Sequence, residues 1–265
     1  MSRGQELVNR FVLGVDVEKY SVRNVRQQDD TQRALHHILS EAAEAAGLDR
    51  QDWVTMPGGD GEHAILPADV DMVAVAGALV AQLDDLLTAY NEDHSDSMKI
   101  RLRVAMHMDT VLRSALGYAG PGLVVLSRLL DAAELKAALA GATDASLALL
   151  VSEPVYRSVI QSGLGGLRPG RFRMLTIDNP AKGFRQAAYL YIPGTAAGAA
   201  GASRTAEETA AAGSARETSS PDRGDDASAG GGPVYHTTVN QPVIGRDLNI
   251  GGRDLTVGSS PGAGE

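Results

Sequence analysis

Two aspartates carry the clearest chemical signal in this sequence. Asp16 stands near the end of a short apolar run at 11–17, and Asp60 lies in the sequence PGGDG at 57–61. If 11–17 is a strand and 57–61 is the turn of a hairpin beside it, two carboxylates meet at strand ends. Such oxygens suit Mg²⁺, particularly when substrate phosphates complete the coordination. The pair predicts a divalent-cation site, although GGDG taken alone is as readily an ordinary tight turn.

The glycines around Asp60 bear on the same site. Gly59 and Gly61 lack a side chain, so the backbone there could approach a bound nucleotide closely. The sequence therefore predicts Gly59 and Gly61 as ligand-contacting residues.

Hydrophobic periodicity predicts the elements that would position these residues. Alternation and short apolar runs indicate strands, spacing of three to four indicates helices, and Thr31 suits a helix cap. The expected strands are 11–17, 53–55, 63–66, 100–107, 147–151, 172–177 and 186–192, and the expected helices are 31–46, 69–90 and 122–140. This order suits an α/β sandwich with helices on one sheet.

Composition excludes several classes of function. Lys and Arg number 24 against 33 Asp and Glu, a net charge of −9, and no basic block could track nucleic acid. The absence of cysteine excludes disulfides, thiolate metal sites and a cysteine nucleophile. The polar N-terminus is unlike a signal peptide, and no run approaches the roughly 18 apolar residues of a membrane span. We expect a cytoplasmic protein without a membrane or nucleic-acid partner.

The composition changes after Pro193. Residues 194–232 contain no Val, Ile, Leu, Met, Phe, Tyr or Trp, so they predict a disordered linker following a folded domain at 9–193. Apolar residues return at 233–258, where Gly-Arg-Asp-Leu occurs twice. Short aliphatic strands of this kind can stack on identical chains. A homotypic interaction motif and a lone hairpin or unstructured end explain this segment equally well.

Four segments in order resemble the successive motifs of class III nucleotidyl cyclases, and the resemblance covers nearly all of residues 9–193. They are VDVEKYSV at 15–22, GGDGEHAIL at 58–66, IRLRVAMHMDTV at 100–111 with GPGLVVLSRLLDA at 120–132, and AKGFRQAAYLYI at 181–192. The chain is most similar to an actinobacterial branch with a low-complexity tail. Its C-terminal segment resembles bacterial amyloid-signalling or RIP-homotypic-type motifs, which would bind a partner protein.

The resemblance implies a ferredoxin-like α+β sandwich with a central, mostly antiparallel sheet. It implies two Mg²⁺ or Mn²⁺ ions held by Asp16, Asp60 and the carbonyl of Val17, which activate the ribose 3′ oxygen for attack on the α-phosphate. Arg128 would neutralise transition-state charge and Lys182 would bind the triphosphate. The family also implies a homodimer in which Asp16 and Asp60 face the partner subunit's Arg128.

Other positions depart from the family pattern. Val124 stands where the family has a ribose-positioning asparagine, and Met56 and Gly117 stand at the base-reading positions. Neither Met56 nor Gly117 can hydrogen-bond a purine edge through its side chain. Asp109 replaces the glycine of the usual His-x-Gly, in which His107 is expected to be a core or supporting residue.

Four further polar residues are expected to have structural roles and not functional ones. His36 and His37 lie on a helix without a metal-ligand spacing, so we expect surface or packing roles. Arg101 and Arg103 alternate on a strand and predict surface or interface ion pairs.

Two functions follow. One is a metal-dependent enzyme that converts a nucleoside triphosphate to a cyclic 3′,5′-nucleotide and pyrophosphate. The other is a degenerate cyclase-fold adaptor that acts through dimerisation and the C-terminal motif. Asp16, Asp60 and Arg128 favour the enzyme, whereas Val124 and the base-reading positions favour the adaptor.

Overall fold

A computed structural model describes residues 7–115 and 117–194. The expected linker at 194–232, apart from Gly194, and the expected motif at 233–258 lie outside the described residues. Both therefore stay predictions.

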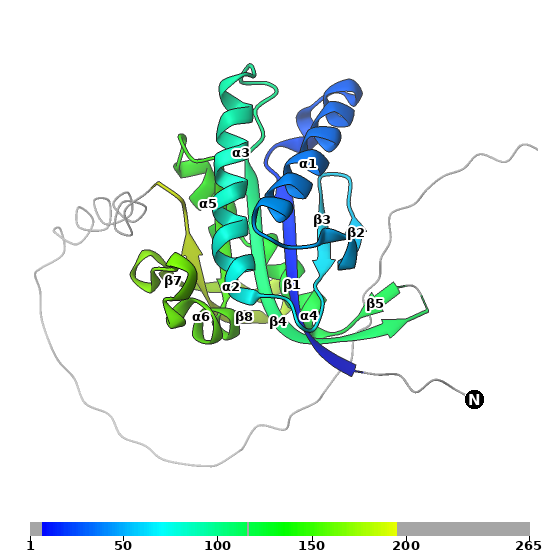
Figure 1. Ribbon diagram of the computed structural model, residues 1–265, viewed down its shortest axis with the longest axis vertical. Helices are drawn as coiled ribbons and strands as arrows, with labels where there is room; N and C mark the ends of the chain where they lie inside the picture. The colour runs from blue at the N-terminus through cyan, green and yellow to red at the C-terminus, as the bar shows by residue number, and fades with distance from the viewer. Residues whose placement is uncertain (1–6, 116, 195–265) are drawn as a thin grey trace, which may run out of the picture. The chain divides into compact units, whose positions relative to one another are not determined.

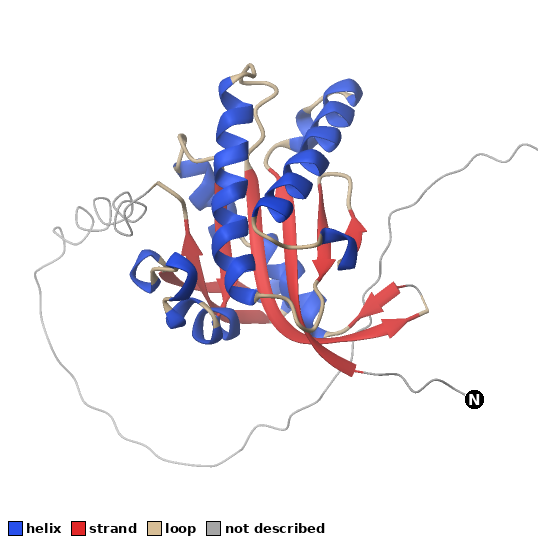
Figure 2. Ribbon diagram, in the orientation of Figure 1, coloured by secondary structure: helices blue, strands red, loops and turns tan. Residues whose placement is uncertain are grey.

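The described residues form one mixed sheet around a central strand (Figure 2). The strands are β1 (Leu7–Val17), β2 (Val54–Pro57), β3 (Gly61–Ile65), β4 (Leu102–Ser114), β5 (Gly117–Ala119), β6 (Leu147–Ser152), β7 (Arg173–Asn179) and β8 (Phe184–Tyr191). Their order is β2-β3-β1-β4-β6-β8-β7, and β5 pairs with β4. The β4–β6 pair is parallel and the other pairs are antiparallel. This sheet confirms the expected α/β class with a mostly antiparallel centre.

Helices cover both faces of the sheet, and Figure 1 shows α1 and α3 side by side across one of them. The helices are α1 (Val25–Ala45), α2 (Met72–Ala74), α3 (Val80–Glu92), α4 (Pro121–Leu130), α5 (Ala133–Gly141) and α6 (Glu153–Ser158). Leu35 of α1 and Leu83 of α3 belong to one buried cluster, whereas Leu126 of α4 and Leu135 of α5 belong to another.

Strand β1 contributes to both clusters because successive side chains point to opposite faces. Leu13 and Val15 pack on the side of α1 and α3, and Val12 packs on the side of α4. Asp16 follows Val15 and therefore belongs to the α4 side. The two-residue period of a strand that is packed on both faces thus decides the face on which this carboxylate lies.

Two expected helices were wrong in detail. α1 begins six residues before Thr31, and its cap is Asn24, whose side chain accepts from the Gln27 amide at 3.0 Å. Thr31 is fully buried inside the helix, where its hydroxyl donates to the Gln27 carbonyl. The single helix expected at 122–140 is two helices, since α4 ends at Leu130 and α5 begins at Ala133.

One helical stretch departs from the expectation that no segment could span a membrane. Within the described residues, the helical stretch Met72–Glu92 is long and apolar enough to cross a membrane, judged by length and composition alone. Its fully buried Leu79, Leu83 and Leu87 pack in the core cluster of α1, and 33% of the apolar window is buried within the domain. A π-helical turn, η3 (Val75–Leu79), lies inside this stretch.

The hairpin that carries Asp60 depends on one glycine. A Cβ added at Gly61 would lie 1.9 Å from the Val15 carbonyl oxygen, because the backbone of β3 approaches that of β1 closely where the two strands pair. The same addition at Gly59 meets nothing within 4 Å. We predict that Gly61→Ala lowers the free energy of unfolding by about 1–3 kcal/mol, the usual cost of overpacking, in urea denaturation.

Gly59→Ala is the matched control, and it should leave the unfolding free energy nearly unchanged. Equal losses in the two variants would show that the close approach at Gly61 does not constrain the hairpin.

Candidate functional site

Asp16 lies where three strands meet. In the registers of β1, it pairs with Gly61 of β3 on one side and with Arg103 of β4 on the other. Its side chain is 19% exposed. The carboxylate is therefore largely removed from water at the end of a buried strand.

Asp60 lies in the turn between β2 and β3. The turn is closed by a bond from the Gly58 amide to the Gly61 carbonyl at 2.7 Å, and the Val17 amide donates to the Asp60 carbonyl at 2.8 Å. The second bond fastens the turn to the end of β1, next to Asp16.

Both aspartates line one pocket of about 500 Å³ on the α4 side of the sheet. This volume is typical of small-molecule sites. The other lining residues are Val15, Met56, Pro57, Gly58, Gly61, Glu62, His63, Ser127, Leu130, Asp131 and Lys182. Of the expected site residues, the structure thus brings together Asp16, Asp60, Gly61 and Lys182.

Arg103 is a site residue that the sequence analysis assigned to a surface or interface ion pair. Its Nε donates to Asp16 Oδ1 at 2.8 Å, and its Nη2 contacts the same oxygen. Its side chain is 13% exposed, so this ion pair is internal to the domain. Arg101 likewise pairs internally, with Glu18 at 2.8 Å. The missing signal was the β1–β4 register, which a strand pattern alone does not provide.

Burial raises the pKa of Asp16 above its ordinary value, and the negative charge of Asp60 acts in the same direction. The hydrogen bond and positive charge of Arg103 oppose this rise. Asp16 is thus a carboxylate whose charge is costly to bury, and an additional cation at the pocket would stabilise it.

The carboxylates fit a hard divalent cation that keeps other ligands. Asp16 and Asp60 supply oxygen ligands at one pocket, and the residues described here contain no group of three or more His, Cys, Asp or Glu side chains arranged around a metal position. Mg²⁺ commonly binds through one or two carboxylates, with water and substrate phosphates in the remaining positions. The pair suits such an ion and does not suit a cage made by the protein alone.

Gly59, Gly61 and Val17 were expected to contact the ligand or the metal, and the structure gives each a different setting. Gly61 lines the pocket but is required by the close approach of Val15, so packing explains it. Gly59 is open to added atoms but does not line the pocket. Val17 is 1% exposed and contributes its amide to the Asp60 bond, while the ligand role of its carbonyl stays a prediction.

Arg128 does not line the pocket. It lies in the last turn of α4, its Nη1 donates to the Lys182 carbonyl at 2.9 Å, and its guanidinium lies 5.3 Å from the centre of the Phe184 ring. Val124, one turn earlier, is 50% exposed, and the pair occupies the side of α4 that faces away from buried Leu126.

Lys182 ends the 3₁₀ turn η7 (Pro180–Lys182) between β7 and β8. Its Nζ lies 3.7 Å from Asp131 Oδ2, and Lys136 contacts Oδ1 of the same carboxylate. Lys182 is 52% exposed, so this ion pair is weak and its ammonium can move to another anion.

Of the two positions expected to read the base, Met56 and Gly117, only one lies at the pocket. Met56 lines the pocket, whereas Gly117 opens β5 and does not. His63, which the sequence analysis did not assign, also lines the pocket, and burial lowers its pKa. At neutral pH it is an uncharged ring with one donor and one acceptor.

His107 is buried, as expected for a core or supporting residue, with 3% exposure. Neither ring nitrogen has a hydrogen-bond partner, and Nε2 lies 3.6 Å from Asp109 Oδ2. Burial lowers the pKa of His107, and the charge of Asp109 opposes that effect.

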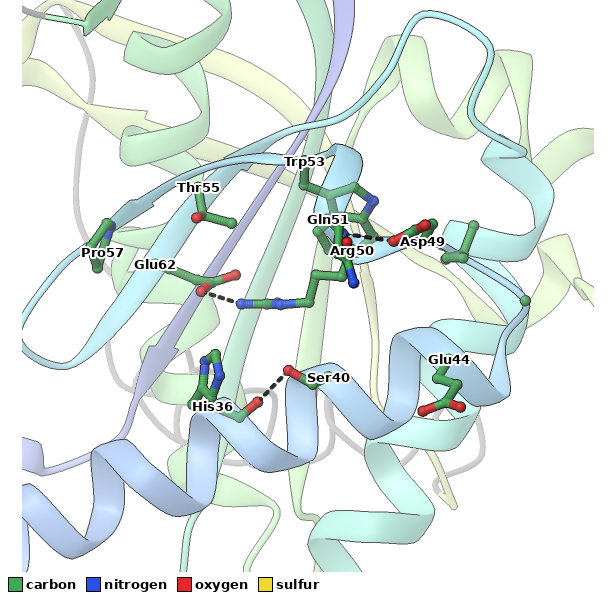
Figure 3. Close-up of a pocket in the computed structure, with 12 residues that line it drawn as sticks. His36, Ser40, Glu44, Asp49, Arg50, Gln51, Trp53, Thr55, Pro57 and Glu62 are labelled. Atoms are coloured by element: carbon green, nitrogen blue, oxygen red, sulfur yellow. Dashed lines mark hydrogen bonds and ion pairs between the residues drawn. The ribbon is translucent and has the colours of Figure 1, made fainter.

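A larger cavity, of about 1010 Å³, lies between α1 and the edge strand β2 (Figure 3). An ion pair crosses it, in which Arg50 Nη2 lies 2.6 Å from Glu62 Oε2 and both side chains are 13% exposed. Neither Asp16 nor Asp60 lines this cavity. His36 lies on its α1 wall, where an exposed surface role is as expected.

Comparison with known proteins identifies the fold. No family model matches the sequence, and no curated protein matches it. An adenylate/guanylate cyclase/hydrolase from Silicibacter pomeroyi is 15% identical with a TM-score of 0.52, covering 72% of this chain and 99% of that one. A bacterial light-regulated adenylyl cyclase is 14% identical with a TM-score of 0.50, covering 71% of this chain and 53% of that one. The described residues therefore adopt the fold of adenylate and guanylate cyclase domains.

The raised pKa of Asp16 generates a pH prediction. Because its folded-state pKa exceeds the unfolded value of about 3.9, the stability contributed by this group is lost as the pH rises through and above that value. Asp16→Asn cannot ionise, so its unfolding free energy should rise relative to the wild type as the pH increases above about 4, the unfolded pKa of aspartate. Urea denaturation in the presence of a chelator measures this difference.

The ion pair with Arg103 forms only when Asp16 is ionised, so its effect is already part of the shifted pKa of Asp16. Differences between the Asp and Asn side chains other than ionisation do not change with pH. The test is therefore the slope, against pH, of the difference in unfolding free energy between Asp16→Asn and the wild type. A flat difference, or one that falls with pH, would contradict the assignment.

Proposed function

We propose that this protein is a metal-dependent nucleotidyl cyclase that converts a nucleoside triphosphate to a cyclic 3′,5′-nucleotide. The observation that carries the proposal is the convergence of Asp16, Asp60 and Lys182 on one pocket within a cyclase fold. In the reaction the ribose 3′ oxygen bonds to the α-phosphorus. The bond between the α-phosphorus and the oxygen that bridges to the β-phosphate breaks, and pyrophosphate leaves. The proton of the 3′ hydroxyl is released as that oxygen attacks.

Asp16 and Asp60 would hold Mg²⁺ or Mn²⁺, with the Val17 carbonyl as a further ligand. The cation supplies charge neutralisation at the attacking and leaving oxygens. Both Arg103 bonds end on Asp16 Oδ1, so Oδ2 remains for the cation.

Arg103 has a second role in this proposal. With a divalent cation bound at Asp16, Arg103 would share the carboxylate charge with that cation, and its ion pair would weaken. The Arg103 guanidinium, which contacts Asp16 at the edge of the pocket, would then be available to the triphosphate. Its planar donors suit phosphate oxygens, as those of arginine generally do.

Lys182 and Arg128 supply the remaining positive charge. Lys182 would exchange Asp131 for the triphosphate, which carries more negative charge. Arg128 faces away from the core beside exposed Val124, so we propose that it acts across a homodimer. The partner subunit's Arg128 would then neutralise charge that develops on the phosphate held by Asp16 and Asp60.

A second candidate function is a cytoplasmic adaptor that has lost turnover. Specific observations favour it: Val124 replaces the ribose-positioning amide, Met56 is the side chain at the base-reading position in the pocket, and Gly117 lies outside the pocket. In this version, nucleotide-dependent dimerisation and the segment at 233–258 carry the signal to a partner protein through a tether at 194–232.

Metal and nucleotide should stabilise the domain together. The cation removes the repulsion between the two carboxylates and the triphosphate supplies its remaining ligands, so Mg²⁺ or Mn²⁺ with the preferred triphosphate should raise stability more than either alone. At a ligand concentration 100 times its Kd the gain is about 2.7 kcal/mol. Thermal unfolding with ATP, GTP, CTP and UTP measures the gain, and mass spectrometry detects any cyclic product.

Substitutions separate binding from turnover. Asp16→Ala or Asp60→Ala should remove the joint stabilisation while leaving the domain folded. Arg128→Ala should preserve that stabilisation and lower turnover by about 10²–10³, as loss of a transition-state donor does. If no triphosphate stabilises the wild type in the presence of metal, the cyclase proposal fails, and the adaptor remains only in a form that signals through the segment at 233–258 without nucleotide.

The tail generates a separate prediction. Truncation after Gly194 should preserve metal–nucleotide binding, because the described pocket uses no residue beyond Lys182. If the C-terminal motif is homotypic, a peptide of residues 234–258 on an inert carrier should form β-rich assemblies. A peptide that stays monomeric at high concentration and binds no partner would remove the adaptor's proposed output.

A further inference from the structure

The two backbone segments next to the carboxylates need external support. After Asp16 the chain enters a loop in which Lys19 has a φ of 57°, the one positive value among non-glycine residues in the described chain. This left-handed conformation is unfavourable for L-residues and persists where surrounding contacts impose it. The 3₁₀ turn η1 (Tyr20–Val22) follows directly.

The hairpin turn is equally dependent on contacts. Gly58, Gly59 and Asp60 are exposed, and glycine adds backbone freedom. The bond between the Val17 amide and the Asp60 carbonyl joins this turn to the end of β1, and the bond between the Gly58 amide and the Gly61 carbonyl closes it. Neither bond reaches the loop that contains Lys19 and Tyr20.

One side chain on α1 joins the turn to this loop. Gln32 Nε2 donates to Tyr20 Oη at 2.8 Å and to the Gly59 carbonyl at 2.7 Å. An amide nitrogen has two hydrogens, so each acceptor can receive one. Gly59 immediately precedes Asp60, and Tyr20 lies in the loop that follows Asp16.

The helix provides a rigid mounting for this amide. α1 is 21 residues long and starts with a capping box in which Asn24 and Gln27 exchange side-chain and backbone bonds. Thr31 and Leu35, on either side of Gln32 along the helix, are buried. The backbone at Gln32 is therefore held by the core.

We infer that Gln32 is a positioning residue for the two carboxylates, through its bonds to Tyr20 and Gly59. This inference rests on the proposed metal–triphosphate function. In this inference Gln32 does not contact the metal or the substrate. It acts through the chain segments next to Asp16 and Asp60, to which it is hydrogen-bonded. Removing an outer partner of this kind typically lowers metal affinity by about 10- to 100-fold.

Two substitutions test the inference with Mn²⁺ and inorganic triphosphate, which presents phosphates without a base. Free Mn²⁺ is followed by electron paramagnetic resonance. Gln32→Met keeps the length of the side chain and removes both donors, so affinity should fall at least about tenfold. Gln32→Glu is isosteric but cannot donate when ionised, so affinity should fall as well.

The glutamate variant separates positioning from charge. An added carboxylate would by itself attract the cation, so tighter Mn²⁺ binding in Gln32→Glu would overturn the inference. Unchanged affinity in Gln32→Met would also overturn it. Gln28→Met is the matched control, since Gln28 lies on the same helix and donates to the Arg23 carbonyl at 3.0 Å, and its affinity should match that of the wild type.

Hydrogen exchange of the metal-free protein gives a readout that does not require binding. In Gln32→Met the Val17 amide and the amides at 58–61 should exchange faster, while those of β4 are unchanged. Unchanged exchange at both segments would overturn the inference even if Mn²⁺ binds. If no variant, including the wild type, binds Mn²⁺–triphosphate, the proposed function fails, and exchange still decides whether Gln32 holds both segments.

Discussion

The pairing of β1 between β3 and β4 is the constraint on which the rest of this structure depends. Alternate β1 side chains fill two buried clusters, so a shift of one residue would exchange the faces of the whole strand. That register places Asp16 beside Gly61 on one side and Arg103 on the other. The close approach of β3 to β1 in this register leaves no room for a side chain at Gly61. The bond from the Val17 amide holds the Asp60 turn at the end of β1. The position of the two carboxylates is therefore a consequence of core packing.

Asp16 and Asp131, two of the carboxylates at the pocket, are paired with cationic side chains of the same chain. Arg103 neutralises Asp16, and Lys182 and Lys136 lie beside Asp131. Burying an uncompensated carboxylate would be costly, and the raised pKa of Asp16 shows that even the arginine compensates it incompletely. A metal–triphosphate complex carries both positive and negative charge. Its cation could take the place of Arg103 beside Asp16, and its phosphates could take the place of Asp131 beside Lys182. This exchange gives a physical reason for metal and nucleotide to bind together.

The proposed chemistry is divided between two surfaces of one chain. Asp16, Asp60 and Lys182 line a single pocket, whereas Arg128 is bonded to the Lys182 carbonyl on the outward side of α4, next to exposed Val124. A single chain thus holds the groups proposed to bind metal and triphosphate, and a second copy would bring its arginine.

The sequence by itself determined the elements whose signals are local. The short apolar run at 11–17, the glycine-rich turn and the alternation at 100–107 were sufficient to predict β1, the β2–β3 hairpin and part of β4, and hence the meeting of Asp16 with Asp60. Helix boundaries were less accurate, because Thr31 and Asn24 are both acceptable caps and packing selected Asn24. Only the tertiary structure decided the partner of Arg103, the packing requirement at Gly61 and the bonds of Gln32. Each of these depends on the approach of segments distant in the chain, and side-chain identity along one strand or helix carries no information about that distance.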